Sequence, residues 1–387
     1  MPDSTSLFAQ IVKIIPKAVF ERAVRDTRAE HGSKGFSCYS QFVGMLFCQF
    51  AHAKSLREVC DGLAVTCGKL NHLGIRKAPT QSTLLYANKH RPWQLYFNLF
   101  GYMVQQCESV APGKKGRFQF KNPLYSVDST TVDLCLSLFP WAKFRQTKGA
   151  IKLHVTLSHD GYMPAFAVVT DGSVADITIA RTLSFPEGSI VAMDRGYFDY
   201  GLFGAWTRQG IFFVTRMKDN AVYKVVKTLP IPQRRNILSD EIIELTSVTG
   251  RRSCPFRLRR VVAWDESSQR EFVFLTNHLE LGSTTIAAIY KDRWAIETFF
   301  KSLKQELTIK SFIGTSENAL KTQIWTALIS LLLLRYLQYR SWCGWSFCRL
   351  VGLLRLNLFS YRDLWRWLDN PFEEPPERPT FQLALNI

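Results

Sequence analysis

The sequence lacks the patterns that mark secreted, zinc-binding and membrane-spanning proteins. Its nine cysteines are scattered and no C-x-x-C pair occurs, which excludes a zinc ribbon or a recognisable disulfide framework. The first twenty residues do not have the order of charge, apolar core and small-residue cleavage site of a signal peptide. The most apolar run, residues 324–334, is too short to span a bilayer, which needs about 20 residues. We expect reduced thiols, a cytosolic location, a buried helix at this run and no membrane partner.

Acidic residues are few compared with basic ones. The chain of 387 residues has 49 Lys and Arg against 32 Asp and Glu, a formal net charge of +17. An excess of this size indicates a polyanionic partner, most commonly nucleic acid, although a basic enzyme with no such partner is the alternative. Apolar residues make up 47% of the chain, so two or three globular domains are expected.

The first part of the chain is helical and basic in its pattern. Residues 1–120 hold 16 Lys and Arg against seven Asp and Glu, with apolar residues at helical spacing. Residues 71–93 resemble a short turn that leads into a basic helix capped by Thr80 or Ser82, an arrangement that suits a helix-turn-helix in a DNA groove. A plain bundle with a solvated basic face fits equally well. We predict a helical DNA-binding domain over residues 1–118, followed by a Gly- and Lys-rich linker.

After the linker the pattern changes to mixed α/β. A strand, a hairpin around Asp160-Gly161, a short apolar strand, a helix and a further strand follow in order. A β-rich insertion with a basic face comes next, and then helices return. The predicted segments are a catalytic core with its first part at 119–220, a β-strand insertion at 221–285, the second part of the core at 286–335, and a helical C-terminal region with a Pro-rich tail at 336–387.

One helical stretch places an acid in a basic stripe. In "YKDRWAIETFFKSLKQEL", a turn of about 100° per residue puts Tyr290, Arg293, Glu297 and Lys304 within an arc of about 60° beside the apolar face. An ordinary solvated face, with an ion pair between Glu297 and Lys301, would account for this pattern.

Two further acids follow apolar strands. Asp128 ends "LYSVD" and Asp194 follows "SIVAM". A carboxylate there is costly to bury unless it is paired or binds metal. Asp194 could instead cap the next helix, with Arg195 or Arg216 as its partner. Together with Glu297, the two acids indicate a site for Mg²⁺ or Mn²⁺, because these ions prefer carboxylate oxygens and water.

These motifs resemble bacterial insertion-sequence DDE transposases. Asp128 in "VDST", Asp194 in "MDRGYFD" and Glu297 match the DDE triad in order. Tyr290, Arg293, Glu297 and Lys304 have the spacing of the YREK signature of insertion sequence family four. The resemblance covers roughly residues 120–335. It implies a ribonuclease H-like mixed-sheet core, with Asp128 on the first strand, Asp194 after the fourth and Glu297 on a later helix, and it also implies a β-strand insertion between Asp194 and Glu297.

The resemblance also implies an activity. The family cuts transposon ends and joins the 3′-OH to target DNA, and several members pass through a hairpin. Asp128, Asp194 and Glu297 would hold two Mg²⁺ ions, with Mn²⁺ as a substitute, for attack on phosphate. Arg293 and Lys304 would bind phosphates, and Tyr290 would hydrogen-bond or stack at the terminus. The partners would be double-stranded inverted repeats, target DNA and a second copy in a synaptic homodimer, in the bacterial cytoplasm at the nucleoid.

Several assignments have alternatives. Trp264 could stack on a flipped base or pack in the insertion core, and Lys152 with His154 could line a DNA channel or be half-exposed strand residues. Asp133 competes with Asp128 for the first catalytic position, and Asp171 and Asp176 are further carboxylates near the core. A ribonuclease H-like structure-specific nuclease, or an inactive copy that acts as a DNA-binding repressor, would share many of these features.

Overall fold

The computed structural model describes residues 5–33, 35–66, 68–111, 118, 120–145, 148–233, 236–309 and 311–373. The linker expected after residue 110 and the Pro-rich tail from residue 370 lie mostly outside the described residues. The chain divides into two compact units, one formed by residues 1–103 with 325–387 and the other by residues 104–324. Each unit is described below by itself.

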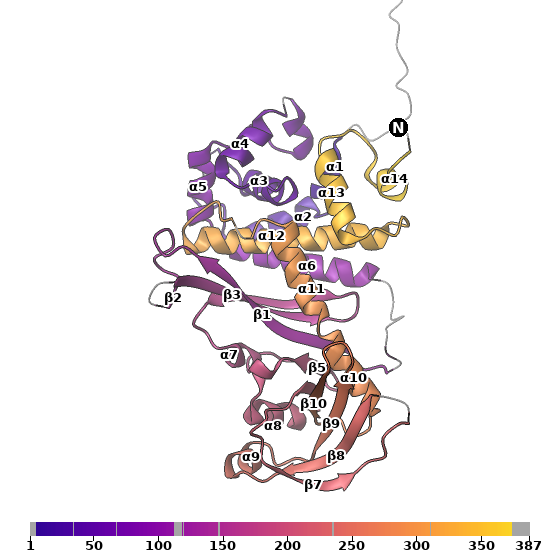
Figure 1. Ribbon diagram of the computed structural model, residues 1–387. Coiled ribbons are helices and arrows are strands. Elements are labelled where there is room, and N and C mark those ends of the chain that lie inside the picture. The colour runs from indigo at the N-terminus through magenta and orange to yellow at the C-terminus, as the bar shows by residue number, and fades with distance from the viewer. Residues whose placement is uncertain are drawn as a thin grey trace, which may run out of the picture. The chain divides into compact units, whose positions relative to one another are not determined.

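The first unit is helical, as the sequence predicts, and contains both ends of the described chain (Figure 1). The amide of Phe8 donates to the carbonyl of Leu358 (2.9 Å), and Ser6 forms a β-bridge with Tyr361. Its elements are α1 Leu7–Val12, α2 Lys17–Thr27, α3 Cys38–Phe50, α4 Leu56–Ala64, the 3₁₀ helix η1 Lys69–Leu73, α5 Gln81–His90, most of α6 Gln94–Val110, most of α12 Glu317–Arg340, α13 Phe347–Asn357 and α14 Leu364–Asp369.

The apolar run at residues 324–334 lies within α12 and is buried throughout, as expected. Among the described residues, no helix is both long enough and apolar enough to cross a membrane. The N-cap of α5 is also as predicted, because the Thr80 hydroxyl accepts a hydrogen bond from the Thr83 amide (3.2 Å).

The second unit is built on one mixed sheet. The strand order is β2-β3-β1-β5-β6-β10-β9-β8-β7, with β4 paired to β3. The pairs β1–β5 and β5–β6 are parallel, and the other strand pairs are antiparallel. The strands are β1 Leu124–Leu134, β2 Lys143–Arg145, β3 Lys148–Ser158, β4 Met163–Asp171, β5 Ile190–Met193, β6 Phe212–Arg216, β7 Tyr223–Thr228, β8 Ile237–Leu245, β9 Leu258–Asp265 and β10 Arg270–Thr276. The mixed α/β class is therefore confirmed.

Strands β7 to β10 continue this sheet. β10 pairs with β6 at Phe274, Leu275 and Thr276, and β9, β8 and β7 follow outward (Figure 1). The structure also adds the short strand β2, so Asp194 follows the fifth strand and not the fourth. A three-residue strand is too short for an alternating pattern to reveal it in the sequence.

Alternation along the strands sorts the side chains between two helical layers. Val127 and Met193 face one apolar cluster with α8 (Tyr200–Arg208), while Leu124 and Ala192 face another with α10 (Ser283–Asp292). The remaining elements of the unit are α7 Asp176–Ala180, η2 Arg195–Tyr197, α9 Val248–Ser253 and α11 Ala295–Glu306. By the period of two, Asp128 falls on the side of Leu124, which is the side that α10 covers.

The stretch from Tyr290 to Leu307 is not one continuous helix. α10 ends at Asp292 and α11 begins at Ala295, and Arg293 and Trp294 form the junction. The amides of Trp294, Ile296 and Glu297 each bond a carbonyl three residues earlier, which is the tighter 3₁₀ pattern. A turn of 100° per residue over the whole stretch therefore does not describe side-chain directions across the junction. Arg293 and Glu297 are nevertheless in contact.

Candidate active site

Adjacent parallel strands bring Asp128 and Asp194 together. In the register of β1 and β5, Val127 lies opposite Met193, and each acid comes directly after its member of this pair. Neighbouring strands are about 4.8 Å apart, so the two acids stand side by side where the parallel pairing ends. This edge is a frequent location of ligand sites in α/β sheets.

The carboxylate of Asp194 points to α10. Its Oδ1 accepts a hydrogen bond from the Tyr290 hydroxyl (3.2 Å). The side chain makes no capping bond to η2, and Arg195 pairs with Asp219 (2.7 Å). The structure thus shows Asp194 in contact with a residue of the YREK stretch, and not as a helix cap paired with Arg195.

Arg293 joins the other two acids. Its Nη1 lies 3.2 Å from Oδ2 of Asp128, and its Nη2 lies 2.9 Å from Oε1 of Glu297. The Arg293 side chain is 6% exposed, against 22% for Asp128 and 37% for Glu297. Glu297 therefore pairs with Arg293 of the preceding turn, and one buried guanidinium bridges a strand acid and a helix acid.

The charges at this edge are unbalanced. The pKa of Asp128 is raised to about 6, mainly by burial. The Asp194 and Glu297 carboxylates also raise this pKa, and the Ser129 amide and Arg293 oppose the rise. Burial likewise raises the pKa of Tyr290 to about 12, so its hydroxyl stays protonated and donates to Asp194. Although burial opposes it, the nearby Tyr290 and the three carboxylates raise the pKa of Arg293. Three carboxylates thus face one guanidinium.

The lysines predicted to bind DNA lie on either side of β1. Lys304 on α11 donates to the carbonyl of Thr131 on β1 (3.0 Å). Lys152 on β3 pairs with Asp176 (3.2 Å) and is cross-strand partner to Thr131. Trp264 is half-buried on β9, and three strands separate β9 from β1 in the sheet. The lysines accordingly flank the strand that bears Asp128, while Trp264 belongs to the outer part of the sheet.

The competing acids occupy different positions. Asp133 is exposed on β1 and has the opposite parity to Asp128, so it points away from α10. Asp171 is exposed at the end of β4. Asp176 accepts hydrogen bonds from Ser129 (2.7 Å) and Lys152 (3.2 Å) and lies beside His154. Of these carboxylates, Asp128 is the one that Arg293 links to Glu297.

Sequence reasoning missed a buried polar chain behind the acids. Both ring nitrogens of His159 form hydrogen bonds. Nε2 lies 2.7 Å from the Ser126 hydroxyl, and Nδ1 lies 2.7 Å from Oδ2 of Asp292. Tyr162 also donates to Asp292 (3.1 Å). Ser126 lies two residues before Asp128 and Asp292 directly precedes Arg293, so this chain ties the end of α10 to β1. Their proximity in sequence to Asp128 and Arg293 was the available signal.

The negative charge of the site suits a metal ion, but its carboxylates are not close enough together to hold one in this structure. Within the part of the chain that the structure describes, no group of three or more His, Cys, Asp or Glu side chains lies at metal-holding distances. Arg293 lies between Asp128 and Glu297 and balances one of three negative charges. The two remaining charges and the carboxylate oxygens are what hard divalent cations require.

Comparisons with known proteins identify the family of this chain. A family model described as Transposase DDE domain matches residues 119–333, and one described as a domain of unknown function (DUF4372) matches residues 3–76. A Sinorhizobium fredii protein named as transposase y4zB is 31% identical over 307 residues, covering 78% of this chain and 83% of the relative. A Geobacillus stearothermophilus protein named as a transposase for insertion sequence element IS5377 is 31% identical over 258 residues, covering 66% and 67%.

A solved structure, the piggyBac transposase synaptic complex with hairpin DNA, covers 95% of this chain and 82% of that chain at 11% identity and a TM-score of 0.44. The family match includes all three acids and the YREK residues. The resemblance to the bacterial insertion-sequence enzymes is therefore confirmed, and this chain belongs to the DDE transposases.

Proposed function

We propose that this protein binds the terminal inverted repeats of an insertion sequence, cleaves the DNA ends and joins the 3′-OH to target DNA. The observation that carries the proposal is the placement of Asp128 beside Asp194 on adjacent strands, with Arg293 joining Asp128 to Glu297. The sheet, in which β1 pairs with β5 and β5 pairs with β6, serves as a ribonuclease H-like core in this proposal. The work is then divided among a DNA-binding domain at 1–118, a core at 119–220 and 286–335, an insertion at 221–285 and a C-terminal region at 336–387.

Asp128, Asp194 and Glu297 would hold two Mg²⁺ ions, for which Mn²⁺ can substitute. Bound there, the ions supply activation of the attacking oxygen and charge neutralisation at phosphate. The chain's own residues prepare the site: Tyr290 fixes Asp194 through its protonated hydroxyl, and Arg293 holds Asp128 and Glu297. Phosphoryl transfer asks little more of a protein than positioning and charge.

The basic residues are assigned to DNA. Lys304 and Lys152, on the two sides of β1, would add positive charge along the path of the duplex. Arg293 is buried between its two acids, so positioning comes before phosphate contact in its role. Trp264 would stack on a base displaced near the end, including at a hairpin intermediate. Two ends must meet, so the acting form would be a homodimer on DNA in the bacterial cytoplasm.

The test is cleavage of a labelled duplex that carries the flanking inverted repeat, in Mg²⁺, Mn²⁺ or EDTA. Glu297→Gln and Asp128→Asn should retain DNA binding and lose metal-dependent nicking. Asp133→Asn is the matched control, since it removes an exposed acid from the same strand, and it should cleave like the wild type. Specific binding with no cleavage by the wild type in any metal would favour a repressor derived from a transposase. Cleavage of branched DNA without preference for the repeat would favour a structure-specific nuclease.

A further inference from the structure

The outward face of α5 in the first unit is polar and exposed. Gln81, Ser82, Leu85, Tyr86 and Lys89 are all exposed and recur at helical spacing. Tyr86 is 66% exposed, and its ring stacks on His90 with the ring centroids 4.1 Å apart. A face of this composition is suited to contact with a partner that offers both polar and flat apolar groups.

The inward face of α5 is held firmly. Leu84 is buried beside Gly44 of α3, and the side chains of Val59 and Leu63 of α4 lie beside the same glycine. Asn88 is fully buried and its Oδ1 accepts a hydrogen bond from Nε2 of Gln41 (2.8 Å). Helices α3, α4 and α5 therefore form a packed group (Figure 1), and the outward residues of α5 are presented on a rigid support.

The charge around α5 has one sign over a long stretch. Residues 62–107 contain no Asp or Glu, and their Lys and Arg residues are Lys69, Arg76, Lys77, Lys89 and Arg91. Two hollows border the helix, one at its N-terminal end and the other along its length. Arg76 and Lys77 line one, together with Asp61 of α4, and Arg28, His31 and His90 line parts of the other. Basic groups at the start of the helix and along its length suit contact with the phosphates that border a DNA groove.

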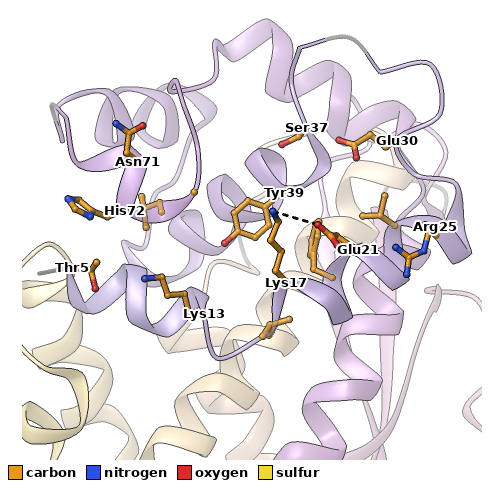
Figure 2. Close-up of a pocket in the computed structure, with 15 residues that line it drawn as sticks. Thr5, Lys13, Lys17, Glu21, Arg25, Glu30, Ser37, Tyr39, Asn71 and His72 are labelled. Atoms are coloured by element: carbon orange, nitrogen blue, oxygen red, sulfur yellow. Dashed lines mark ion pairs between the residues drawn. The ribbon is translucent and has the colours of Figure 1, made fainter. Parts of the chain in front are cut away.

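Another hollow of the same unit has walls of mixed charge. Figure 2 shows Lys13, Lys17 and Arg25 at its wall together with Glu21 and Glu30. Lys17 is paired with Glu21 (3.6 Å), and Glu30 accepts a hydrogen bond from the amide of Cys38 (2.9 Å). Mixed charge of this kind does not favour a polyanion, which leaves α5 as the better candidate in this unit.

We infer that α5 is the helix that reads the terminal inverted repeat in the major groove of double-stranded DNA. This inference rests on the proposed transposase function and assigns its sequence selectivity to Gln81 and Tyr86. Gln81 can form paired hydrogen bonds with a base edge, and Tyr86 offers an apolar ring to a thymine methyl. Arg76, Lys77 and Lys89 contact phosphates and fix the register of the helix. The connection between α4 and α5, which contains η1, is longer than the usual helix-turn-helix turn of about 3–4 residues.

The experiment measures fluorescence anisotropy of the full chain with two labelled duplexes over a range of salt. One duplex carries the terminal inverted repeat and the other has the same composition in scrambled order. Gln81→Ala and Tyr86→Ala should each weaken binding to the repeat about tenfold while leaving the scrambled duplex unchanged. Lys77→Ala should weaken both duplexes alike and reduce the slope of log K against log salt by about one. Lys17→Ala, which removes an exposed lysine from the hollow of mixed charge in Figure 2, should bind both duplexes as the wild type does.

The outcomes separate this inference from the proposed function. If the wild type prefers the repeat and cleaves it, but the α5 variants show the same preference, the assignment of α5 is overturned and the transposase function stands. An equal loss of DNA affinity in Lys17→Ala and Lys77→Ala also overturns the assignment, because binding would then depend on overall positive charge and not on α5. If the wild type neither prefers nor cleaves the repeat, both proposals fail. All substituted side chains are exposed, so unchanged melting temperatures will show that the variants fold.

Discussion

A buried ion pair connects the outer strands to the segment that leads into α10. Arg259 on β9 and Asp240 on β8 have side chains that are 6% and 2% exposed, and two hydrogen bonds of 2.7 Å join them. Arg259 also donates to the carbonyls of Leu279 and Leu281, just before α10 begins at Ser283. The guanidinium thus fastens the entry of the helix that carries Tyr290 to the sheet.

Asp240→Asn should be strongly destabilising. The substitution leaves a buried guanidinium with carbonyl oxygens but no opposite charge, which costs about 3–5 kcal/mol in other proteins. The whole free energy of unfolding of a domain is about 5–15 kcal/mol, so this loss would be a large part of it. Glu241→Gln is the matched control, because Glu241 and Arg260 pair on the same two strands at 2.9 Å with 19% exposure each. More water around that pair should limit its cost to about 1 kcal/mol.

Urea unfolding followed by circular dichroism and tryptophan fluorescence measures both costs. The variant Asp240→Leu/Arg259→Met removes both charges together, and it should recover much of the stability lost in Asp240→Asn. An Asp240→Asn variant no less stable than Glu241→Gln would refute the reasoning, and so would a double variant less stable than Asp240→Asn.

Three other changes test separate features. Burial lowers the pKa of His154, which lies between Asp176 and Lys152, to about 4, against about 6.5 in the unfolded chain. The stability that the neutral ring contributes is complete above pH 6.5, and about 3 kcal/mol of it is lost as the pH falls to 4. His154→Gln should therefore lose less stability in acid than the wild type, as measured by urea unfolding. Asp292→Asn should keep DNA binding but lower the cleavage rate about tenfold, because a hydrogen bond to a charged group that ties α10 to β1 is weakened; an unchanged rate would contradict this role. Gly204→Ala should lower the melting temperature, because the added Cβ would strike the carbonyl oxygen of Ser253, whereas Gly352→Ala, which meets open space, should not.

The acids could be located from the sequence because strands and helices have different periods. Apolar runs that end in Asp128 and Asp194 define strand ends, and the spacing of Tyr290, Arg293, Glu297 and Lys304 defines a shared side. The sequence also indicated the N-terminal helices, the insertion strands and the buried run in α12. These features depend on neighbours in the chain, which local patterns describe well.

The features that were missed depend on tertiary contacts. The junction at Arg293 and Trp294 has helical backbone angles, so its residue pattern continues the helix while its hydrogen bonds do not. The role of His159 arises only when the β3–β4 turn meets both Ser126 and Asp292. The continuation of the sheet beyond β6 depends on pairing with β10, which no local pattern specifies. The ion pair between Arg293 and Asp128 likewise forms only when α10 packs against the sheet.

The continuous sheet also bears on how the site folds. Asp194 and Glu297 are far apart in sequence, and closing one loop of that length costs conformational entropy before any contact is gained. Strands β7, β8, β9 and β10 pair in sequence with their neighbours, and β10 then pairs with β6 beside β5. Each step closes a much shorter loop than the whole, so the ladder shortens the search that brings the third acid to the first two. The outer strands thus provide a local route to a non-local active site.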